Sequence, residues 1–162
     1  IARNGVDQNP LDVRDDAIAA RLLAYCWPDQ LDRLARLGAA ITTARTYPPS
    51  VDAEDAADWI ERRLAEPQTK GTARIVMHSV FWQYLPVDKQ NRIEAAILKA
   101  GGSANADRPL SWLSFEPDPP AISPMLLRLK LWPQEEMLQL AACHPHGSII
   151  NWFGAGSAAS RK

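Results

Sequence analysis

The segment at residues 73–80 reads Ala-Arg-Ile-Val-Met-His-Ser-Val, a short and largely apolar run without strict alternation. Such a run is typical of a strand that is buried on both faces in a parallel sheet. Residues 86–102 follow with apolar positions at helical spacing, and we predict that Gly101 and Gly102 form the C-cap of this helix. Residues 110–116 give a second, largely apolar strand. The strand–helix–strand order predicts an α/β fold with a parallel pair of strands.

The chain after this unit has an antiparallel pattern. Leucines at 127, 129 and 131 alternate with Arg128 and Lys130, which predicts a strand with one face in water. Turns at residues 132–136 and 144–147 separate it from a returning strand at 137–143 and a last strand at 148–153. The sequence therefore predicts a sheet with a parallel centre and an antiparallel C-terminal meander.

Residues before position 73 are mainly helical in pattern. Residues 5–13 read as a strand end that runs into a loop, and Asp15 or Asp16 then caps a helix with apolar residues between 18 and 26. A second helix carries residues 31–41, and Asp52 is the expected cap of a third. We expect residues 1–153 to be the C-terminal portion of one α/β domain and residues 154–162 to be a flexible tail.

Composition excludes several classes of function. The 162 residues carry a net charge of −1, which provides no field to attract nucleic acid. The longest apolar runs are far shorter than the roughly 20 residues needed to cross a bilayer, and no signal peptide is visible. We therefore expect a cytoplasmic protein without nucleic-acid or membrane partners. Cys26 and Cys143 show no framework spacing, so we expect buried free thiols.

Six separated motifs occur in order between residues 3 and 152. They are Gly-Val-Asp-Gln-Asn-Pro-Leu-Asp-Val at 5–13, Trp-Pro at 27–28, His-Ser-Val-Phe-Trp-Gln-Tyr-Leu-Pro at 78–86, Trp-Leu-Ser-Phe-Glu at 112–116, Trp-Pro at 132–133 and His-Pro-His-Gly at 144–147. Together they resemble the C-terminal half of a bacterial domain-of-unknown-function family, family 2332. That family is distantly similar to the class I S-adenosylmethionine-dependent methyltransferases. The resemblance implies a Rossmann-like methyltransferase-type sheet that is incomplete here because its N-terminal part is missing.

The methyltransferase resemblance also implies a cofactor, S-adenosylmethionine, and residues that would hold it. On that pattern Asp7 holds the ribose hydroxyls, Asp55 lies near the adenine, and His78 with Ser79 lies at the catalytic mouth. Asp7 has the alternative role of stiffening a turn, and Asp55 that of a helix cap. No glycine-rich cofactor turn occurs in these residues. We therefore expect the fragment alone to be inactive, with an exposed sheet flank available for a homodimer.

The segment from His78 to Glu116 holds the remaining candidate residues. A histidine at a strand end is suited to act as a general base, and Ser79 to orient a small-molecule ligand. Trp82 and Tyr84 would form an aromatic wall for a planar or cationic group, and Glu116 would contact substrate. The alternatives are a hydrogen-bonded histidine in a packed aromatic knot and, for Glu116, a salt bridge at the rim.

Three functions follow from these residues. The first is a methyltransferase-like domain that binds S-adenosylmethionine when complete, and the alternative is a non-catalytic Rossmann-like binding or interaction module. The third is a hydrolase or metal enzyme that combines His78 with the turn histidines, His144 and His146. Zinc sites need three or four converging ligands, which this sequence does not suggest, so we predict no metal site.

Overall fold

A computed structural model describes residues 2–118, 124–145 and 148–153. The chain divides into two compact units, Ile1–Trp59 and Ile60–Lys162. The expected tail at 154–162 lies outside the described residues. None of the described helices is both long and apolar enough to cross a membrane.

The first unit combines a short parallel strand pair with two helices. Its elements are β1 (Asn4–Asp7), α1 (Asp16–Ala24), α2 (Leu31–Thr46) and β2 (Ser50–Ala53), and β1 pairs with β2 in parallel. The predicted cap of α1 is Asp15, whose carboxylate accepts from the backbone N–H groups of Ala17 at 2.8 Å and Ile18 at 3.3 Å. The Arg45 guanidinium donates to the Val13 carbonyl at 2.8 Å and so ties the end of α2 to the loop before α1.

One expectation for this unit is wrong. Asp52 does not cap the third helix, because it lies within β2, and Asp55 takes that place by accepting from the Ala57 N–H at 2.9 Å. The strand is only four residues long, too short to display a hydrophobic period of its own. Its pairing with β1 depends on residues far away in sequence, which no local pattern reveals. The third helix itself, α3 (Ala56–Ala65), forms as predicted.

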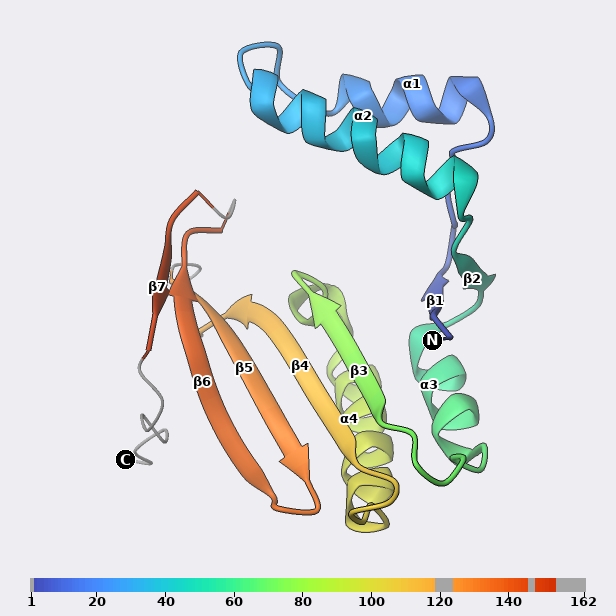
Figure 1. The fold of residues 1–162 in the computed structure, drawn as a ribbon, viewed down its shortest axis with the longest axis vertical. Helices are drawn as coiled ribbons and strands as arrows, with labels where there is room; N and C mark the ends of the chain where they lie inside the picture. The colour runs from blue at the N-terminus through green and yellow to red at the C-terminus, as the bar shows by residue number, and fades with distance from the viewer. Residues whose placement is uncertain (1, 119–123, 146–147, 154–162) are drawn as a thin grey trace. The chain divides into compact units, whose positions relative to one another are not determined.

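The second unit is a mixed five-stranded sheet with a helix packed on it (Figure 1). After α3, its elements are β3 (Arg74–Ser79), the 3-10 turn η1 (Trp82–Tyr84), α4 (Val87–Gly102), β4 (Leu110–Pro117), β5 (Met125–Trp132), β6 (Glu136–Cys143) and β7 (Ile150–Trp152). The strand order is β3-β4-β5-β6-β7, with β3 and β4 parallel and all later pairs antiparallel. A mixed α/β unit with a parallel pair and an antiparallel meander is thus confirmed. The predicted parallel centre is wrong for the described sheet, because the parallel pair β3–β4 lies at one edge of it.

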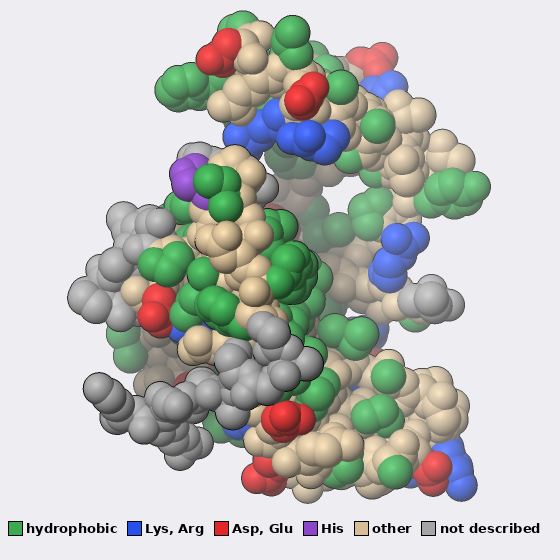
Figure 2. Space-filling view, turned by 60° about the vertical axis from the view of Figure 1, so that its left-hand side comes forward, with side chains coloured by type: hydrophobic (Ala, Val, Ile, Leu, Met, Phe, Trp, Pro, Cys, Tyr) green, Lys and Arg blue, Asp and Glu red, His purple; other side chains and the backbone are tan. Residues whose placement is uncertain are grey.

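The burial predicted for β3 is wrong. The strand forms the edge of the five-stranded sheet, and its side chains alternate between half-buried and exposed. Ile75 and Met77 are 66% and 67% exposed, whereas Val76 between them is half-buried. An apolar run does not by itself tell a strand covered on both faces from one with an exposed apolar face. Figure 2 shows hydrophobic side chains gathered over the strands of this unit, with few charged side chains among them.

The helix α4 packs closely against the sheet at a glycine. It lies on β4 and β5, with Ile93, Ile97 and Gly101 buried. A Cβ atom built on Gly101 would lie 2.3 Å from Cε2 of Trp132, a distance that real Cβ atoms do not tolerate. The predicted C-cap role of this glycine is therefore wrong: α4 continues through Gly102 and Ser103 is the cap. Glycine is required at 101 because the indole ring occupies the place of a side chain.

A second cluster packs the opposite face of the sheet. It is formed by the buried side chains of Met125, Ala141 and Cys143, with Phe115 and Leu127 packed against them. Cys26 and Cys143 are both buried and unpaired, which confirms the expectation of free thiols.

The close approach at Gly101 predicts different effects for two neighbouring substitutions. Gly101→Ala should lower the free energy of unfolding by about 1–3 kcal/mol, because the ring must shift out of a packed core. Gly102→Ala is the matched control: nothing lies within 4 Å of the added Cβ, so the gain in helix propensity should leave stability unchanged or slightly higher. Urea denaturation measures both. Equal stability of the two variants would contradict the packing described for Trp132.

Candidate functional site

The candidate site lies where the parallel strands β3 and β4 end. The register pairs His78 with Ser114 and Ser79 with Phe115, so His78 and Glu116 are at the carboxyl ends of adjacent strands. In α/β sheets this edge is where ligands bind, because the following loops leave a crevice there. Glu116 is 6% exposed and is the one buried charged residue of the described structure.

One oxygen of the Glu116 carboxylate accepts three hydrogen bonds. Its Oε1 accepts from Nδ1 of His78 at 2.7 Å and from the backbone N–H groups of Phe81 at 3.0 Å and Trp82 at 3.2 Å. Consecutive N–H groups that point at one oxygen are a common way to bind an anion with the backbone. These bonds compensate for part of the cost of burying a carboxylate.

The two N–H groups are aimed at Glu116 by a sharp turn after β3. Val80 has a φ of +48°, a left-handed conformation that a β-branched residue rarely adopts. Its own N–H still donates to the Phe115 carbonyl at 2.9 Å, so the pairing with β4 continues up to the turn. The strained residue is thus held between a strand pair and a bound carboxylate, which is where such strain is expected.

The histidine of the site is engaged at both ring nitrogens. Nε1 of Trp112 donates to Nε2 of His78 at 3.0 Å. An indole N–H is a donor only, so Nε2 must be the unprotonated nitrogen and Nδ1 must carry the proton that is donated to Glu116. The imidazole in this arrangement is therefore neutral, and the contact with Glu116 is a hydrogen bond between a neutral ring and a carboxylate.

Aromatic rings enclose the imidazole. The Trp82 ring stacks on His78 with centroids 5.3 Å apart and an interplanar angle of 26°, and Trp112 and Phe81 lie with centroids at 6.0 Å and 6.1 Å. The side chain of His78 is consequently only 12% exposed. A general-base role for His78 stays a prediction, and it requires that Trp112 first release Nε2.

The second oxygen of Glu116 is the unused group of the site. Oε2 is buried and has no hydrogen-bond partner among the residues that the structure describes. A buried acceptor without a partner costs about 1–3 kcal/mol, so such atoms are rare outside functional sites. Oε2 therefore has free capacity to accept a hydrogen bond from a ligand.

The structure brings together only some of the predicted residues. His78 is hydrogen-bonded and stacked on Trp82, as the aromatic-knot alternative supposed. Glu116 joins this cluster as a buried hydrogen-bond acceptor, so the alternative of a salt bridge at the rim is wrong. Ser79 is exposed at the end of β3, and Tyr84 is 74% exposed, and neither takes part in this network. Trp112 was not among the residues predicted for the site. The signal was available, because residues 112 and 116 are both even-numbered positions of one strand and therefore share a face.

The two predicted cofactor residues belong to the first unit. Asp7 is exposed at the carboxyl end of β1, where its Oδ1 accepts from the Asn9 N–H at 2.7 Å, and its Oδ2 has no partner among the described residues. Asp55 is the cap of α3, accepting from the N–H groups of Ala57 at 2.9 Å and Asp58 at 3.4 Å. The contacts match the turn and cap alternatives, and the cofactor roles stay predictions.

The turn histidines were considered as metal ligands. His146 lies outside the described residues, and His144 donates its backbone N–H to the Ile149 carbonyl at 3.0 Å. Within the described ranges, no three His, Cys, Asp or Glu side chains gather closely enough to hold a metal ion.

The hydrogen bonds of Glu116 predict a graded loss of stability. Glu116→Ala should lower the free energy of unfolding by about 2–4 kcal/mol, because two backbone N–H groups and Nδ1–H of His78 lose their acceptor. Glu116→Gln keeps an acceptor oxygen and should cost about 1 kcal/mol. The exposed Glu136 supplies the control, and Glu136→Ala should stay within about 0.5 kcal/mol of the wild type in urea denaturation. A Glu116→Ala variant as stable as this control would show that the carboxylate does not organise the cluster.

Comparisons with known proteins give one match. No curated protein and no solved structure matches the chain. The model of a family described as "Uncharacterized protein conserved in bacteria (DUF2332)" matches residues 1–152. This match covers the six motifs on which the family prediction was based. The chain therefore belongs to the bacterial family of uncharacterised proteins DUF2332.

Proposed function

We propose that this chain is part of a methyltransferase-like domain that binds S-adenosylmethionine, with Asp7 as the ribose ligand. The support is the strand–helix order and the parallel pairs β1–β2 and β3–β4. In α/β folds of this kind, nucleotides bind at the carboxyl ends of the strands.

The observation that carries the proposal is the carboxylate of Asp7. It is exposed at the carboxyl end of a parallel strand, and its Oδ2 is not engaged by any described residue. A carboxylate with a free oxygen accepts the hydroxyls of a ribose diol, and Oδ1 can share its bond from Asn9 because each oxygen has two lone pairs. The residues present therefore fit the ribose of a nucleoside.

The Glu116 cluster belongs to the second unit and is a binding site of its own on this proposal. Oε2 of Glu116 accepts a hydrogen bond from the N–H or O–H of a small-molecule ligand, and His78 acts as a positioning residue that holds the carboxylate. Bound S-adenosylmethionine would supply an electrophilic methyl group on a sulfonium. Trp82 and the exposed ring of Tyr84 would offer π-faces to a cation. The chain contains no glycine-rich turn, so we expect weak nucleoside binding and no methyl transfer by these residues alone.

A second candidate is the non-catalytic binding or interaction module. It is favoured by the engagement of both ring nitrogens of His78, because a histidine in this state has no lone pair available for proton transfer. Under this candidate the chain retains the sheet and uses it for contact with small molecules or with a second copy.

Binding of adenosine tests the role of Asp7. We expect ligand-observed NMR to detect adenosine and S-adenosylmethionine on the wild type, and 2′-deoxyadenosine to bind about five- to tenfold more weakly, because it lacks one of the two hydroxyls. Asp7→Asn should abolish this preference.

Asp12→Asn is the matched control for Asp7→Asn. Hydrogen bonds from the side chain and backbone of Arg14, together with the charge of Arg14, lower the pKa of Asp12 to about 2, so this carboxylate already has a partner. The control variant should retain the preference for adenosine. Equal binding of adenosine and 2′-deoxyadenosine by the wild type, or no nucleoside binding at millimolar concentration, would refute the proposal.

Sedimentation tests the expected homodimer of the second candidate. If the flank formed by β3 pairs two copies, the wild type should show concentration-dependent association that Ile75→Lys removes, since a charge on an exposed apolar face opposes burial. Val87→Lys, at a side chain that is 69% exposed on α4, is the control and should associate as the wild type does. A wild type that stays monomeric at all concentrations would contradict the homodimer.

A further inference from the structure

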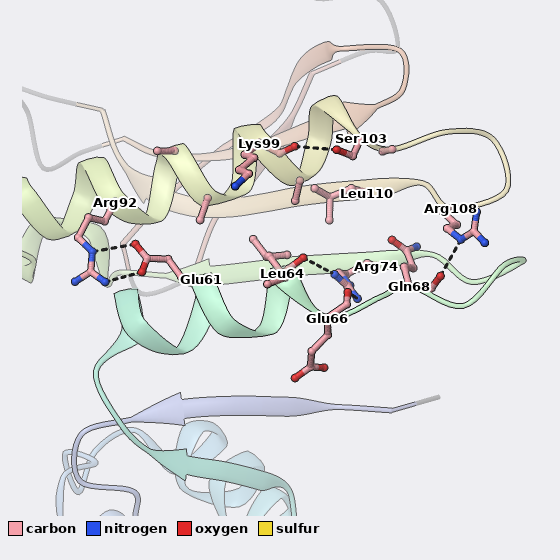
Figure 3. Close-up of a pocket in the computed structure, with 15 residues that line it drawn as sticks. Glu61, Leu64, Glu66, Gln68, Arg74, Arg92, Lys99, Ser103, Arg108 and Leu110 are labelled. Atoms are coloured by element: carbon pink, nitrogen blue, oxygen red, sulfur yellow. Dashed lines mark hydrogen bonds and ion pairs between the residues drawn. The ribbon is translucent and has the colours of Figure 1, made fainter.

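A hollow lies at the other end of the strands β3 and β4. It has a volume of about 660 Å³ and is lined by α3, α4 and the first residues of β3 and β4, including Arg74 and Leu110 (Figure 3). Leu110 and Glu116 are six residues apart in β4, which is about 20 Å at 3.3 Å per residue. The hollow is therefore separate from the Glu116 cluster, and its volume is in the range of sites for small ligands.

The middle of this hollow is lined by apolar side chains. Leu64 and Leu110 face its middle, and three alanines of α4, Ala95, Ala96 and Ala100, form one side. Alanine on the facing side of a helix leaves room for another group. An apolar body of modest size can therefore lie along α4 without displacing a side chain.

Most of the charged side chains that line this hollow are cationic. Arg74, Arg92, Lys99 and Arg108 line it, with Glu61 and Glu66 as the carboxylates. Both carboxylate oxygens of Glu61 accept hydrogen bonds from the Arg92 guanidinium, Oε1 from Nε at 2.9 Å and Oε2 from Nη2 at 2.6 Å. Figure 3 shows this pair at one end of the hollow and Arg74 and Arg108 near the other.

The carboxylate of Glu66, the other acidic residue of the lining, is already paired with an arginine outside the hollow. Both oxygens of Glu66 accept from Arg63, at 3.0 Å each, and Arg63 does not line the hollow. The positive charges of Arg74, Lys99 and Arg108 are therefore left without an acidic partner in the lining.

Backbone carbonyls hold the two arginines in place but do not neutralise them. Arg74 donates to the carbonyls of Leu64 at 3.3 Å and Glu66 at 3.0 Å, and Nε of Arg108 donates to the Gln68 carbonyl at 2.8 Å. A guanidinium has five N–H donors, so most donors of Arg108 and several of Arg74 stay available. Lys99 has no ion-pair partner among the described residues. The end of the hollow thus offers preorganised donors with net positive charge.

We infer that this hollow binds a small organic anion with an apolar body, the anionic head at the end near Arg74 and Arg108 and the body along the alanines of α4, where Lys99 adds positive charge to the wall. The shared chemistry of such ligands is a carboxylate or phosphate head on an alkyl or aryl group. This inference does not depend on the function proposed for Asp7 and Glu116, since no residue is common to the two.

Titration of the full chain with matched amphiphiles tests the inference. We expect octanoate or octyl phosphate to shift the amide signals of α4 between residues 95 and 104 in NMR spectra. The stronger of the two identifies the preferred head group. 1-Octanol, which has the same body without the charge, should bind about tenfold more weakly, and inorganic phosphate, which lacks the body, should also bind more weakly. Raising the salt concentration should weaken binding of the anions but not of the alcohol.

Two pairs of variants locate the site. Lys99→Glu should weaken octanoate binding about fivefold, which corresponds to the ~1 kcal/mol of a strong exposed ion pair. Lys70→Glu makes the same change of charge at a residue outside the lining and should have less than a twofold effect. Ala96→Trp should fill the hollow and abolish binding while the circular dichroism spectrum is retained, whereas Leu98→Trp on the same helix should bind as the wild type does.

Three results would overturn the inference. One is equal binding of octanoate and 1-octanol, which would show that the negative charge of the head group does not contribute to binding. Another is an equal effect of the two lysine substitutions, which would mean that only long-range charge matters. The last is undiminished binding by a folded Ala96→Trp variant, or no binding by the wild type at millimolar concentration.

Discussion

The second unit depends on a buried carboxylate that must be satisfied from several elements at once. Oε1 of Glu116 receives donors from β3 through His78 and from the turn before η1 through Phe81 and Trp82. The two backbone donors require the left-handed conformation of Val80. The His78 donor requires that Nδ1 carry the proton, and this tautomer is fixed by the indole of Trp112 on β4, which donates to Nε2. A carboxylate that is only partly compensated would be costly in this environment, so the end of the parallel pair adopts one arrangement.

This arrangement also changes how the histidine is understood. A histidine at a strand end suggests a proton acceptor, yet its acceptor nitrogen is occupied by Trp112 and its donor nitrogen by Glu116. The residue with spare capacity is instead the glutamate, through Oε2. The spare hydrogen-bonding capacity at the end of this strand pair therefore includes the carboxylate and not the imidazole, and His78 and the tryptophans give the carboxylate a largely buried setting.

Sequence patterns predicted the helices and strands whose apolar residues repeat at regular spacing. They failed where the structure of a segment depends on contacts with residues distant in sequence. The α helices and the antiparallel meander were visible because their apolar residues repeat locally. The four-residue β2 was not, because its stability comes from pairing with β1. Likewise, the role of Gly101 depends on Trp132, thirty-one positions later, and the engagement of His78 depends on Trp112. His78 and Glu116, which were predicted separately as catalytic and substrate-binding residues, lie together because parallel strands bring their carboxyl ends to one edge of the sheet; their roles stay predictions.

The connectivity of the strands has a consequence for the order in which the chain acquires its structure. β5 and β6 are joined by a short turn, whereas the parallel pairs bring together residues 4 with 50 and 74 with 110. Closing a longer loop costs more entropy before any contact rewards it, so the meander should assemble early and offer β4 as a template to β3. During synthesis β3 leaves the ribosome well before that template exists. Until then the backbone of β3 has no strand to pair with, and its Ile75 and Met77, which stay exposed even in the folded structure, lie beside unpaired backbone groups, so we expect chaperones to bind this segment of the nascent chain.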